Sequence, residues 1–520
     1  MRDAATGGEP VIRDGDEAIS RAELEARGAR GAGALIALGV RPDDVVATIM
    51  RNDIAHLEAM RASALAGAAL CQLNWHGAAK EVGEILDDCA ARVVIVHRDL
   101  IPALGAALTG NGARRVIGVA PGPALRAAYG IAADECAARP DPPEWAALRD
   151  AAAPAAPGER MRPMLRYTSG STGKPKGIRR GYRGKPTDYH QVLRRIAPEM
   201  MRMRSAGRFL TAAPLYHSAP SGLAAMAMAM GDMSLTVLPR FEPEGFLHAI
   251  EETRATHIYL VPTMMSRLLK LPEATRARFD ASSVEFCVST GSPFPHDLKL
   301  AMIAWWGPVF WETYGASEIG FMTMASSEEA LRKPGTAGRI QLGGSILIID
   351  EDGNEAPAGA VGDIHVKMDA FGQFDYSNDP EGRAKAEVRG HVSVGDLGWL
   401  DEEGYLFISD RKKDMIISGG ANIFPAEIEA VLIEAPFIGD AAVFGAPDPE
   451  FGEKIVAAIE PAPGWTPDEA EVRAWLDGRL ARMKHPRLIA FHDRLPREDS
   501  GKIFKQRLRA PYWEGAGRKI

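Results

Sequence analysis

Along the chain, segments whose apolar residues have helical spacing alternate with short, continuous apolar runs typical of strands. The segment from Ser20 to Gly39 opens with a capping box and continues as an Ala/Leu-rich run with helical spacing. Residues 45–50 and 93–96 are short β-branched and apolar runs, typical of buried parallel strands, and residues 53–66 return to helical spacing. This alternation predicts an α/β fold in which helices wrap a parallel sheet.

Three further strand-like runs, at residues 209–214, 257–261 and 284–288, each lead soon into a loop that contains Pro or Gly. Residues 224–230 form an apolar, methionine-rich helix between the first two runs. In open α/β sheets the ligand crevice lies at the carboxyl ends of the strands, so we expect the functional loops there. A proline-rich stretch at residues 137–163 is interpreted as a surface connection rather than a domain boundary.

The most distinctive loop is Tyr167–Gly177, which is rich in Gly, Ser and Thr and contains two lysines. Glycine permits positive φ and lets backbone N–H groups converge on a phosphate, so the loop is predicted to bind a triphosphate. The spacing excludes a P-loop NTPase, because only two residues separate Gly170 from the Gly173–Lys174 pair, where that motif has four. A flexible Gly/Ser linker is the alternative, and the lysines and Pro175 disfavour it.

Composition narrows the function classes. The 520 residues, 46% of them hydrophobic, suffice for several domains of roughly 150 residues each. A net charge of −8, from 69 acidic and 61 basic residues, disfavours a nucleic-acid partner. The four cysteines lack Cys-x-x-Cys spacing, which argues against structural zinc and disulfides. With no secretory signal and no run of about 18 apolar residues, the sequence predicts a cytoplasmic protein without an integral membrane segment.

Two weaker motifs follow predicted strands. The small-residue loop Gly291–Pro293 comes after residues 284–288, and the segment Tyr314–Glu318 comes after residues 309–311. A small-residue loop opposite a tyrosine is a plausible slot for a flat base, and Glu318 could hold a magnesium ion that neutralises phosphate charge. Each motif taken alone is better explained as turn residues with a surface acid.

Residues 395–429 carry a longer pattern, from Gly395-Asp396 through Asp410-Arg411-Lys412-Lys413-Asp414 to Gly419-Gly420 and Glu429. Together with the loop at 167–177, the segment 314–318 and the run Pro496–Ile503, this pattern resembles the adenylate-forming superfamily of acyl-CoA synthetases, luciferases and nonribosomal-peptide adenylation domains. The resemblance extends from about residue 20 to 510 and includes four motifs in order.

The resemblance implies ATP, Mg²⁺ and coenzyme A as cofactors and assigns the nucleotide site position by position. The triphosphate loop would comprise Thr168, Ser169, Gly170, Ser171, Thr172, Gly173 and Lys174. The adenine slot would comprise Gly291, Ser292, Pro293, Tyr314, Gly315, Ala316 and Ser317, with Glu312 where an acceptor often meets adenine N6. The ribose would be bound by Asp396 and Arg411, with Ile408 also at the cofactor, and the metal ligands would be Glu318 and Thr168.

Four further assignments concern catalysis and movement. Lys502 matches the lysine that bridges the acyl carboxylate and the α-phosphate during adenylation, and His217 matches a residue near the carboxylate in the acyl pocket. Gly419 and Gly420 match the wall of the pantetheine channel, and Lys413 matches the hinge of a small C-terminal domain. In a charged tail without the family pattern, a Ser-Gly-Lys sequence would be read as a solvated turn.

The resemblance therefore predicts a large α/β domain of sheet subdomains at residues 1–411 and a mobile α+β lid at 412–520. The predicted reaction forms an acyl-adenylate from an acid and ATP and then a thioester with CoA, without a nucleic-acid partner; a homodimer is compatible with the sequence. Small residues at Pro214–Pro220 and the pliable stretch Met226–Met230 suit a bulky apolar acid. The tract at residues 214–220 looks most like that of ligases for fatty, bile-acid or steroid side-chain acids, which implies lipid metabolism. An aryl acid, or loading of a separate carrier protein, is the alternative. A catalytically silent nucleotide-binding protein is the rival from another class.

Overall fold

The computed structural model describes residues 9–110, 112, 114–136, 141–156, 164–169, 175–181, 189–292, 294–371, 373–377, 379–418, 421–497 and 503–514. Its contacts divide the chain into two compact units. The first comprises Met1–Arg332, Gln341–Gly344 and Met368–Ala386, and the second comprises Lys333–Ile340, Ser345–Lys367 and Glu387–Ile520. The predicted boundary between residues 411 and 412 stays a prediction.

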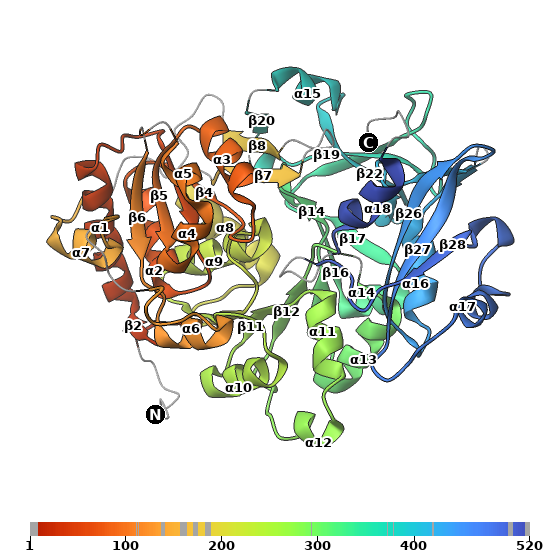
Figure 1. Ribbon diagram of the computed structural model, residues 1–520, viewed down its shortest axis with the longest axis horizontal. Helices are drawn as coiled ribbons and strands as arrows, with labels where there is room; N and C mark the ends of the chain where they lie inside the picture. Colours follow the sequence, from red (N-terminus) through yellow and green to blue (C-terminus); the bar gives the residue numbers. More distant parts are fainter. Residues whose placement is uncertain are drawn as a thin grey trace. The chain divides into compact units, whose positions relative to one another are not determined.

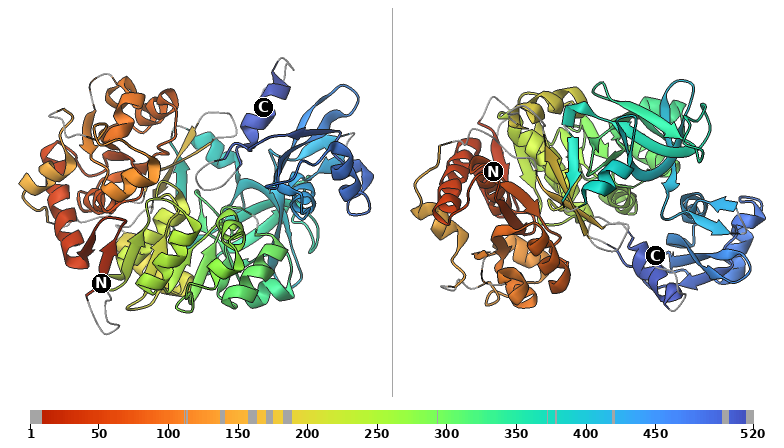
Figure 2. Two further views of the ribbon diagram at one scale, coloured as in Figure 1. Left: turned by 60° about the horizontal axis from the view of Figure 1, so that its bottom comes forward. Right: turned by 90° about the horizontal axis from the view of Figure 1, so that it is seen from above.

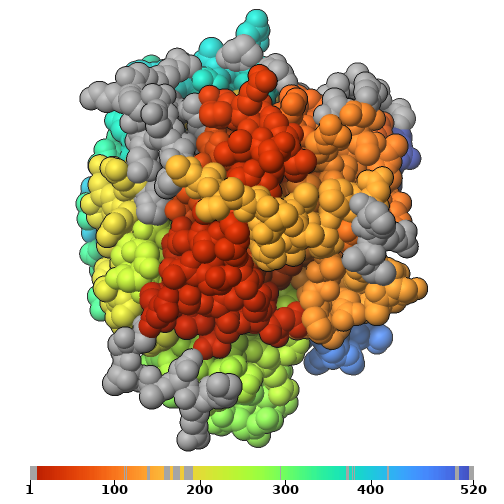
Figure 3. Space-filling model, turned by 90° about the vertical axis from the view of Figure 1, so that its left-hand side faces the viewer, coloured from red at the N-terminus to blue at the C-terminus, as the bar shows by residue number. Residues whose placement is uncertain are grey.

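The first unit contains a parallel sheet covered by helices on both faces (Figure 1). Its strand order is β4-β3-β5-β6, with bounds β3 Val45–Ile49, β4 Ala69–Gln72, β5 Ala91–His97 and β6 Arg115–Val119. One face packs on α1 (Arg21–Ala37), α2 (Ile54–Leu65) and α7 (Trp145–Ala151). The other face packs on α3 (Ala79–Asp88), α4 (Ile101–Leu104) and α5 (Ala106–Thr109). Figure 3 shows the segment that carries α7 lying across α1.

The helix predicted from Ser20 to Gly39 is α1. The Ser20 hydroxyl accepts a hydrogen bond from the Glu23 N–H at 3.1 Å, which satisfies one of the free N–H groups at the helix start. The β-branched run at 45–50 is β3, and every residue of that strand is buried. Burial on both faces explains why this run is continuously apolar and does not alternate with polar residues.

A second sheet of the first unit has the strand order β16-β13-β12-β11-β9-β10-β1-β2. Strands β13, β12, β11, β9, β10 and β1 are parallel neighbours, whereas β16 and β2 are antiparallel to theirs. The strand bounds are β1 Val11–Arg13, β2 Ala18–Ser20, β9 Arg208–Thr211, β10 Ser234–Val237, β11 His257–Tyr259, β12 Phe286–Ser289, β13 Phe310–Glu312 and β16 Thr323–Ser326. The first unit also contains the helices α6 Pro123–Tyr129, α8 Tyr189–Met201, α9 Ser218–Met230, α10 Pro243–Thr253, α11 Pro262–Leu269, α12 Glu273–Arg276, α13 His296–Trp306 and α14 Ser327–Arg332.

Two small antiparallel elements complete the first unit. A three-stranded sheet has the order β20-β8-β7, with β7 Arg166–Ser169, β8 Pro175–Gly181 and β20 Gln373–Tyr376, and α15 (Pro380–Lys385) follows β20. A hairpin pairs β14 (Gly315–Ala316) with β15 (Gly320–Phe321). These two elements contain most of the first unit's predicted nucleotide-binding segments.

The second unit contains two sheets. The first has the order β18-β19-β22-β23-β17, with β17 Thr336–Ile340, β18 Ser345–Ile349, β19 Gly362–Lys367, β22 His391–Leu400 and β23 Tyr405–Arg411, and β21 Glu387–Val388 pairs with β22. The second sheet has the order β25-β24-β27-β26, and a fifth strand, β28, pairs with β27. The strand bounds are β24 Ile416–Ser418, β25 Ala421–Ile423, β26 Ile438–Asp448, β27 Gly452–Pro461 and β28 Leu488–Phe491.

Alternate residues of β26 build two cores on the second of these sheets, drawn in blue in Figure 2. Ala441 and Val443 pack under α16 (Pro425–Ile433) and α17 (Glu469–Leu476), whereas Ala442 and Phe444 pack under α18 (Lys505–Trp513). The period of two along the strand therefore places helices on both faces of the sheet. This arrangement fits the α+β character predicted for the C-terminal segment.

A buried polar network lies beside β3 and α2. The His56 ring is 1% exposed; its Nδ1 lies 3.2 Å from the Arg51 carbonyl, and its Nε2 lies 3.0 Å from Gln72 Nε2 and 3.3 Å from Thr48 Oγ1. Burial lowers the pKa of His56 to about 4, although the Asp53 carboxylate acts in the opposite direction. The ring is therefore neutral at pH 7.

This pKa predicts acid sensitivity. Above pH 6.5 the ring is neutral in both the folded and the unfolded protein, but between pH 6.5 and about 4 only the unfolded chain binds the proton. The free energy of unfolding should therefore fall across that window, by up to roughly 3 kcal/mol from this group. Thermal melting of the wild type and of His56→Gln from pH 4 to 8 checks this. Equal pH slopes in the two proteins would contradict the prediction.

Candidate functional site

The predicted triphosphate loop connects two paired strands. Thr168 of β7 is opposite Lys176 of β8, and Ser169 is opposite Pro175, so the two ends of the loop are held in a hairpin. Residues 170–174, which include Gly170, Ser171, Thr172, Gly173 and Lys174, lie outside the described residues, as do the side chains of Thr168 and Ser169. Their contacts with phosphate stay predictions.

The second lysine of this loop has a structural partner. Lys176 Nζ lies 2.8 Å from the Asp379 carboxylate, and it also lies 5.1 Å from the centre of the Tyr376 ring. Burial of about three quarters of the lysine side chain strengthens such an ion pair relative to a fully solvated one. Lys176 therefore joins β8 to the segment after β20, and Lys174 is the lysine left as a candidate for phosphate.

The candidate metal ligand Glu318 is connected to the same three-stranded sheet. The Tyr376 hydroxyl donates to Glu318 Oε1 at 3.3 Å, and Arg180 Nη2 donates to the Ser317 carbonyl at 2.8 Å. Burial raises the pKa of Tyr376, and the Glu318 charge raises it further, so this phenol stays a hydrogen-bond donor at neutral pH. Sequence reasoning missed both Tyr376 and Arg180, since neither belongs to a motif that was singled out.

Glu318 fits the role of an Mg²⁺ ligand on chemical grounds. Its carboxylate is half-buried and keeps a defined orientation through Tyr376, and Mg²⁺ bound to a nucleotide needs only one or two protein carboxylates. Among the residues that the structure describes, no group of three or more His, Cys, Asp or Glu side chains is arranged to hold a metal by itself. All four cysteines are buried free thiols.

The predicted adenine slot lies after β12 and around β14. Gly291 has φ of +91°, in the region that favours glycine, and Pro293 lies outside the described residues. Gly315 is required for a different reason, because a Cβ there would lie 2.4 Å from the Gly320 carbonyl oxygen. The Tyr314 carbonyl accepts from the Met322 N–H at 2.9 Å, so the β14–β15 hairpin fixes the tyrosine backbone.

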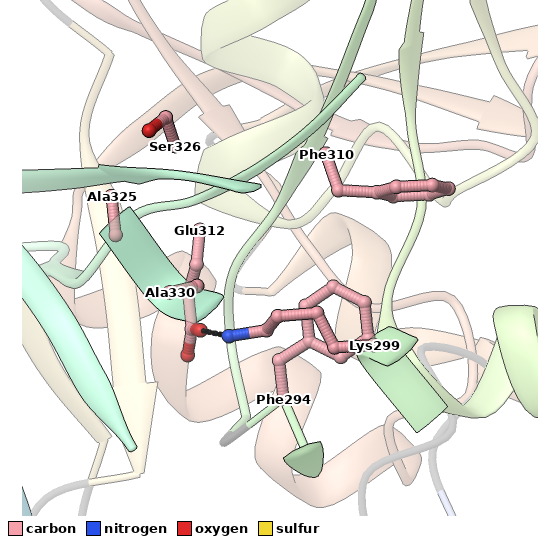
Figure 4. A pocket seen from close by; sticks show the side chains of 7 residues that line it. All are labelled: Phe294, Lys299, Phe310, Glu312, Ala325, Ser326 and Ala330. Carbon is pink, nitrogen blue, oxygen red and sulfur yellow. Dashed lines mark hydrogen bonds and ion pairs between the residues drawn. The ribbon is translucent and has the colours of Figure 1, made fainter. Parts of the chain in front are cut away.

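Glu312, predicted to face adenine N6, forms a buried ion pair with Lys299 of α13 (Figure 4). The Lys299 Nζ and Glu312 Oε2 atoms lie 2.6 Å apart, and the side chains are 6% and 14% exposed. Burial raises the pKa of Glu312, whereas the Lys299 charge opposes that shift. The lysine stem passes over the Phe294 ring, 4.9 Å from Nζ to the ring centre. One carboxylate oxygen of Glu312 is thus already bound by Lys299. The contact of Glu312 with adenine N6 stays a prediction.

The predicted ribose pair is brought together by sheet register. Asp396 of β22 is opposite Arg411 of β23, and Asp396 Oδ1 lies 3.5 Å from Arg411 Nε. The Asp396 residue is 7% exposed, whereas the arginine side chain is 49% exposed. Ile408, on the same strand as the arginine, is 37% exposed. A nearly buried carboxylate beside a solvent-facing guanidinium fits the recognition of a diol.

The predicted hinge Lys413 is exposed in the turn between β23 and β24. The Lys412 ammonium pairs with Asp363 at 2.7 Å, and the Lys413 carbonyl accepts from Arg509 Nη1 at 3.4 Å. Gly419 and Gly420, predicted for the pantetheine channel, and Lys502, predicted for catalysis, lie outside the described residues. Their assignments therefore rest on the sequence.

The predicted acyl-pocket segment is the start of α9. His217 is its N-cap residue, and its ring lies 4.3 Å from the Tyr216 ring. The Ser317 hydroxyl lies 3.3 Å from that of Ser218, so the start of α9 touches the segment that precedes Glu318. Farther along the helix, Met226 and Met228 are 1% and 7% exposed and pack into the core of the unit.

No helix in the described part of the chain is long and apolar enough to cross a membrane.

Comparison with known proteins agrees with this geometry. Residues 2–371 match the family described as AMP-binding enzyme, and residues 427–502 match the AMP-binding enzyme C-terminal domain. The chain belongs to the AMP-binding enzyme family. A feruloyl-CoA synthase from Amycolatopsis sp is 34% identical over 501 residues, which cover 96% of this chain and 95% of the relative. The long-chain-fatty-acid–CoA ligase FadD13 from Mycobacterium tuberculosis is 33% identical over 504 residues, 96% and 94% of the two chains.

A solved structure shows the same fold. It is the o-succinylbenzoate CoA synthetase MenE from Bacillus subtilis, in complex with the acyl-adenylate intermediate OSB-AMP. The TM-score is 0.78 and the sequence identity is 26%, and the match covers 96% of this chain and 95% of the MenE chain. Membership of the AMP-binding enzyme family confirms the predicted fold class, the predicted AMP-forming acid–thiol ligase activity and the cofactor set of ATP, Mg²⁺ and coenzyme A. The type of acid is a separate question.

Proposed function

We propose that this AMP-binding enzyme is an ATP-dependent acyl-CoA ligase for a hydrophobic carboxylic acid of the fatty, bile-acid or steroid side-chain type. The acid would first attack the α-phosphorus of ATP, forming acyl-adenylate and releasing pyrophosphate, and the CoA thiol would then displace AMP. Both partners in the first step are anions, so the site must supply cations and oriented dipoles where charge develops. Bound Mg²⁺ would supply part of that charge.

The proposal rests chiefly on the contact between Ser218 and Ser317. This contact joins the start of α9 to the segment that ends at Glu318. The start of α9 would receive the acid, and Glu318 would hold the metal ion on the phosphates. Beyond the first turn, a Cβ on Gly222 would lie 4.0 Å from the Phe321 ring and would meet no other side chain of the described residues within that distance. The absence of a side chain at Gly222 thus leaves apolar space close to the candidate nucleotide site, which suits an apolar acid.

An aryl acid is the second candidate. The Phe321 ring opposite Gly222 and the Tyr216 ring beside His217 are flat apolar surfaces on which an aromatic acid could stack. The relatives named as a feruloyl-CoA synthase and a long-chain-fatty-acid–CoA ligase are similar in identity, so similarity alone favours neither class. Loading of a separate carrier protein is the third option.

A panel of acids in one assay tests the proposal. The purified protein with ATP and Mg²⁺ would receive a long-chain fatty acid, a bile acid, a steroid side-chain acid, a hydroxycinnamic acid or benzoate, and pyrophosphate release and thioester formation would be measured. We expect the highest kcat/KM with CoA for one of the first three acids. A higher value for an aryl acid would overturn the substrate class, and thioester formation on a carrier protein but not on CoA would overturn the acceptor.

Substitution of the candidate ribose ligand gives a specific prediction. Asp396→Ala should raise the KM for ATP and lower turnover, because each charge-assisted bond to a ribose hydroxyl contributes about 1.5–3 kcal/mol. The fold should persist, since the Asp396 carboxylate lies beside Arg411, the half-exposed last residue of β23. Steady-state kinetics with varied ATP measures the effect, and Asp363→Ala in the neighbouring strand β19 is the control. Unchanged ATP kinetics in Asp396→Ala would remove this residue from the site.

A further inference from the structure

One face of α9 is attached to the four-stranded parallel sheet of the first unit through Ser221. The Ser221 hydroxyl donates to Gln72 Oε1 of β4 at 2.7 Å and accepts from Arg166 Nη2, at the start of β7, at 2.8 Å. The serine is 0% exposed and the glutamine is 5% exposed, so both hydrogen bonds lie in a region of low dielectric, where they are strong. The beginning of α9 is therefore held by a buried side-chain contact.

The orientation of the Gln72 side-chain amide is set at both of its ends. Arg166 Nη1 donates to the same Oε1 atom at 2.9 Å, and Gln72 Nε2 lies 3.0 Å from His56 Nε2. His56 Nδ1 faces the Arg51 carbonyl at 3.2 Å, so Nδ1 carries the proton of the neutral ring and Nε2 accepts from the amide. The amide oxygen of Gln72 is thereby turned toward α9, and its nitrogen toward α2.

A buried asparagine holds the segment that leads into α9. Asn52, which follows β3, is 2% exposed and accepts from the Leu215 N–H through Oδ1 at 2.9 Å. Its Nδ2 donates to the Ala213 carbonyl at 2.9 Å and to the Leu238 carbonyl at 3.1 Å. The approach to α9 and its first turn are therefore both tied to side chains of the same parallel sheet.

A different face of α9 approaches the β14–β15 hairpin. Ser218 contacts Ser317 at 3.3 Å, and Gly222 is the position at which a Cβ would lie 4.0 Å from the Phe321 ring. These two residues of α9 are four positions apart and therefore share one face of the helix. Ser221 lies about 100° away from Gly222 around the helix axis. Its hydrogen bonds consequently determine in which direction the face with Ser218 and Gly222 points.

This rotational setting controls the space beside Gly222. Both neighbours of this glycine along the helix, Ser221 and Leu223, carry side chains. A rotation of α9 would carry the bare Cα of Gly222 away from Phe321 and turn a neighbouring side chain toward that ring. The space would then become narrower, and a misfit of one methylene in an apolar pocket costs roughly 10- to 200-fold in kcat/KM.

We propose that Ser221 and Gln72 are positioning residues that determine how well the enzyme accepts its acid. Their hydrogen bond, reinforced by Arg166, fixes the rotation of α9 and keeps the space at Gly222 open for the apolar part of the acid. The inference rests on the proposed function, in which the start of α9 receives the acid. Ser221 and Gln72 act through Gly222 and contact neither the acid nor the nucleotide.

The test measures the KM for the acid and the KM for ATP in Ser221→Ala and in Gln72→Leu. The full-length protein is used, with the acid that gives the wild type its highest kcat/KM in the panel. We expect each variant to raise the KM for the acid by about tenfold, the effect of a small misfit, while the KM for ATP stays within about twofold. Ser221→Ala keeps the test valid if Gln72→Leu does not fold.

Gln72→Glu is the conservative variant, because it keeps an oxygen that accepts from Ser221 and Arg166. This variant should have a KM for the acid close to that of the wild type. Equal rises of both KM values in Ser221→Ala and Gln72→Leu, or no rescue in Gln72→Glu, would make these residues merely structural. An effect of Ser221→Ala without one of a folded Gln72→Leu would overturn the role of their hydrogen bond.

Ser63→Ala is the matched control. Ser63 is also a buried helical serine, but its hydroxyl donates to the Ala59 carbonyl of its own helix α2, at 2.8 Å, so its loss should change neither KM.

Gly222→Ala separates this inference from the proposed function, because it places a methyl group directly in the proposed space. If Gly222→Ala leaves the KM for the acid unchanged, the start of α9 does not receive the acid and that part of the proposed function fails. If Gly222→Ala raises this KM but Ser221→Ala and Gln72→Leu do not, only the present inference fails.

Discussion

Lys413→Pro should slow the transfer of an acyl group from acyl-adenylate to CoA far more than it slows acyl-adenylate formation. In the proposed reaction a lid would rotate between the two half-reactions, so a hinge at Lys413 would have to change φ and ψ, whereas proline fixes φ near −65°. Among the described residues, the hydrogen bonds of this turn are donated by the N–H groups of Lys412, Asp414 and Met415 and by Arg509 Nη1 to the Lys413 carbonyl, so proline at 413 removes no donor of these bonds. We expect a loss of about tenfold or more in CoA transfer, which corresponds to about 1.4 kcal/mol in the barrier.

Lys413→Ala is the control for this prediction, because it removes the charge and keeps φ free. Rapid-quench measurement of adenylation, and of CoA transfer from supplied acyl-adenylate, gives the two rates for each variant. A comparable fall in both rates for Lys413→Pro would argue against a hinge at this residue. A fall in Lys413→Ala equal to that in the proline variant would assign the effect to the lost charge.

Local signals made several elements predictable. The capping box at Ser20 marks the start of α1, and the β-branched run at residues 45–50 marks β3, because both depend on neighbours within a few positions. The pattern at residues 395–429 names both Asp396 and Arg411, which lie 3.5 Å apart, and their role at the ribose stays a prediction. Such features require no knowledge of which distant strands pair.

The partners of the candidate site residues were not predictable in the same way. Tyr376 contacts Glu318, and Lys176 pairs with Asp379, only because β20 adds to β8 in an antiparallel register, about 200 positions away in the chain. No local periodicity encodes that pairing. The ion pair of Glu312 with Lys299 joins residues only 13 positions apart, but the hydrophobic and polar pattern of α13 and β13 does not encode which side chains meet across the turn between them.

The methionine-rich helix illustrates a further limit of sequence reasoning. Met226 and Met228 suit both a pliable acyl pocket and an ordinary core, and a hydrophobic pattern is identical in the two cases. The structure buries both side chains, and the approach of α9 to the nucleotide segments occurs at its first turn, at Ser218. Substrate selectivity is therefore better sought at Ser218 and Gly222 than at the methionines.

Lys502→Ala should separate the two half-reactions most sharply. Adenylation requires a positive charge beside the α-phosphate, whereas attack of the CoA thiol on a finished acyl-adenylate does not use this lysine in the proposed reaction. Loss of one electrostatic contact that stabilises developing negative charge costs roughly 10²–10³ in rate, so acyl-adenylate formation should fall by that factor. Transfer from added acyl-adenylate to CoA should be nearly unchanged, and single-turnover measurement of each step gives both rates.

Two outcomes of Lys502→Ala would contradict this prediction in different ways. Collapse of both half-reactions in Lys502→Ala would make the lysine structural. Unchanged rates would show that the run Pro496–Ile503 does not carry the catalytic lysine of the family.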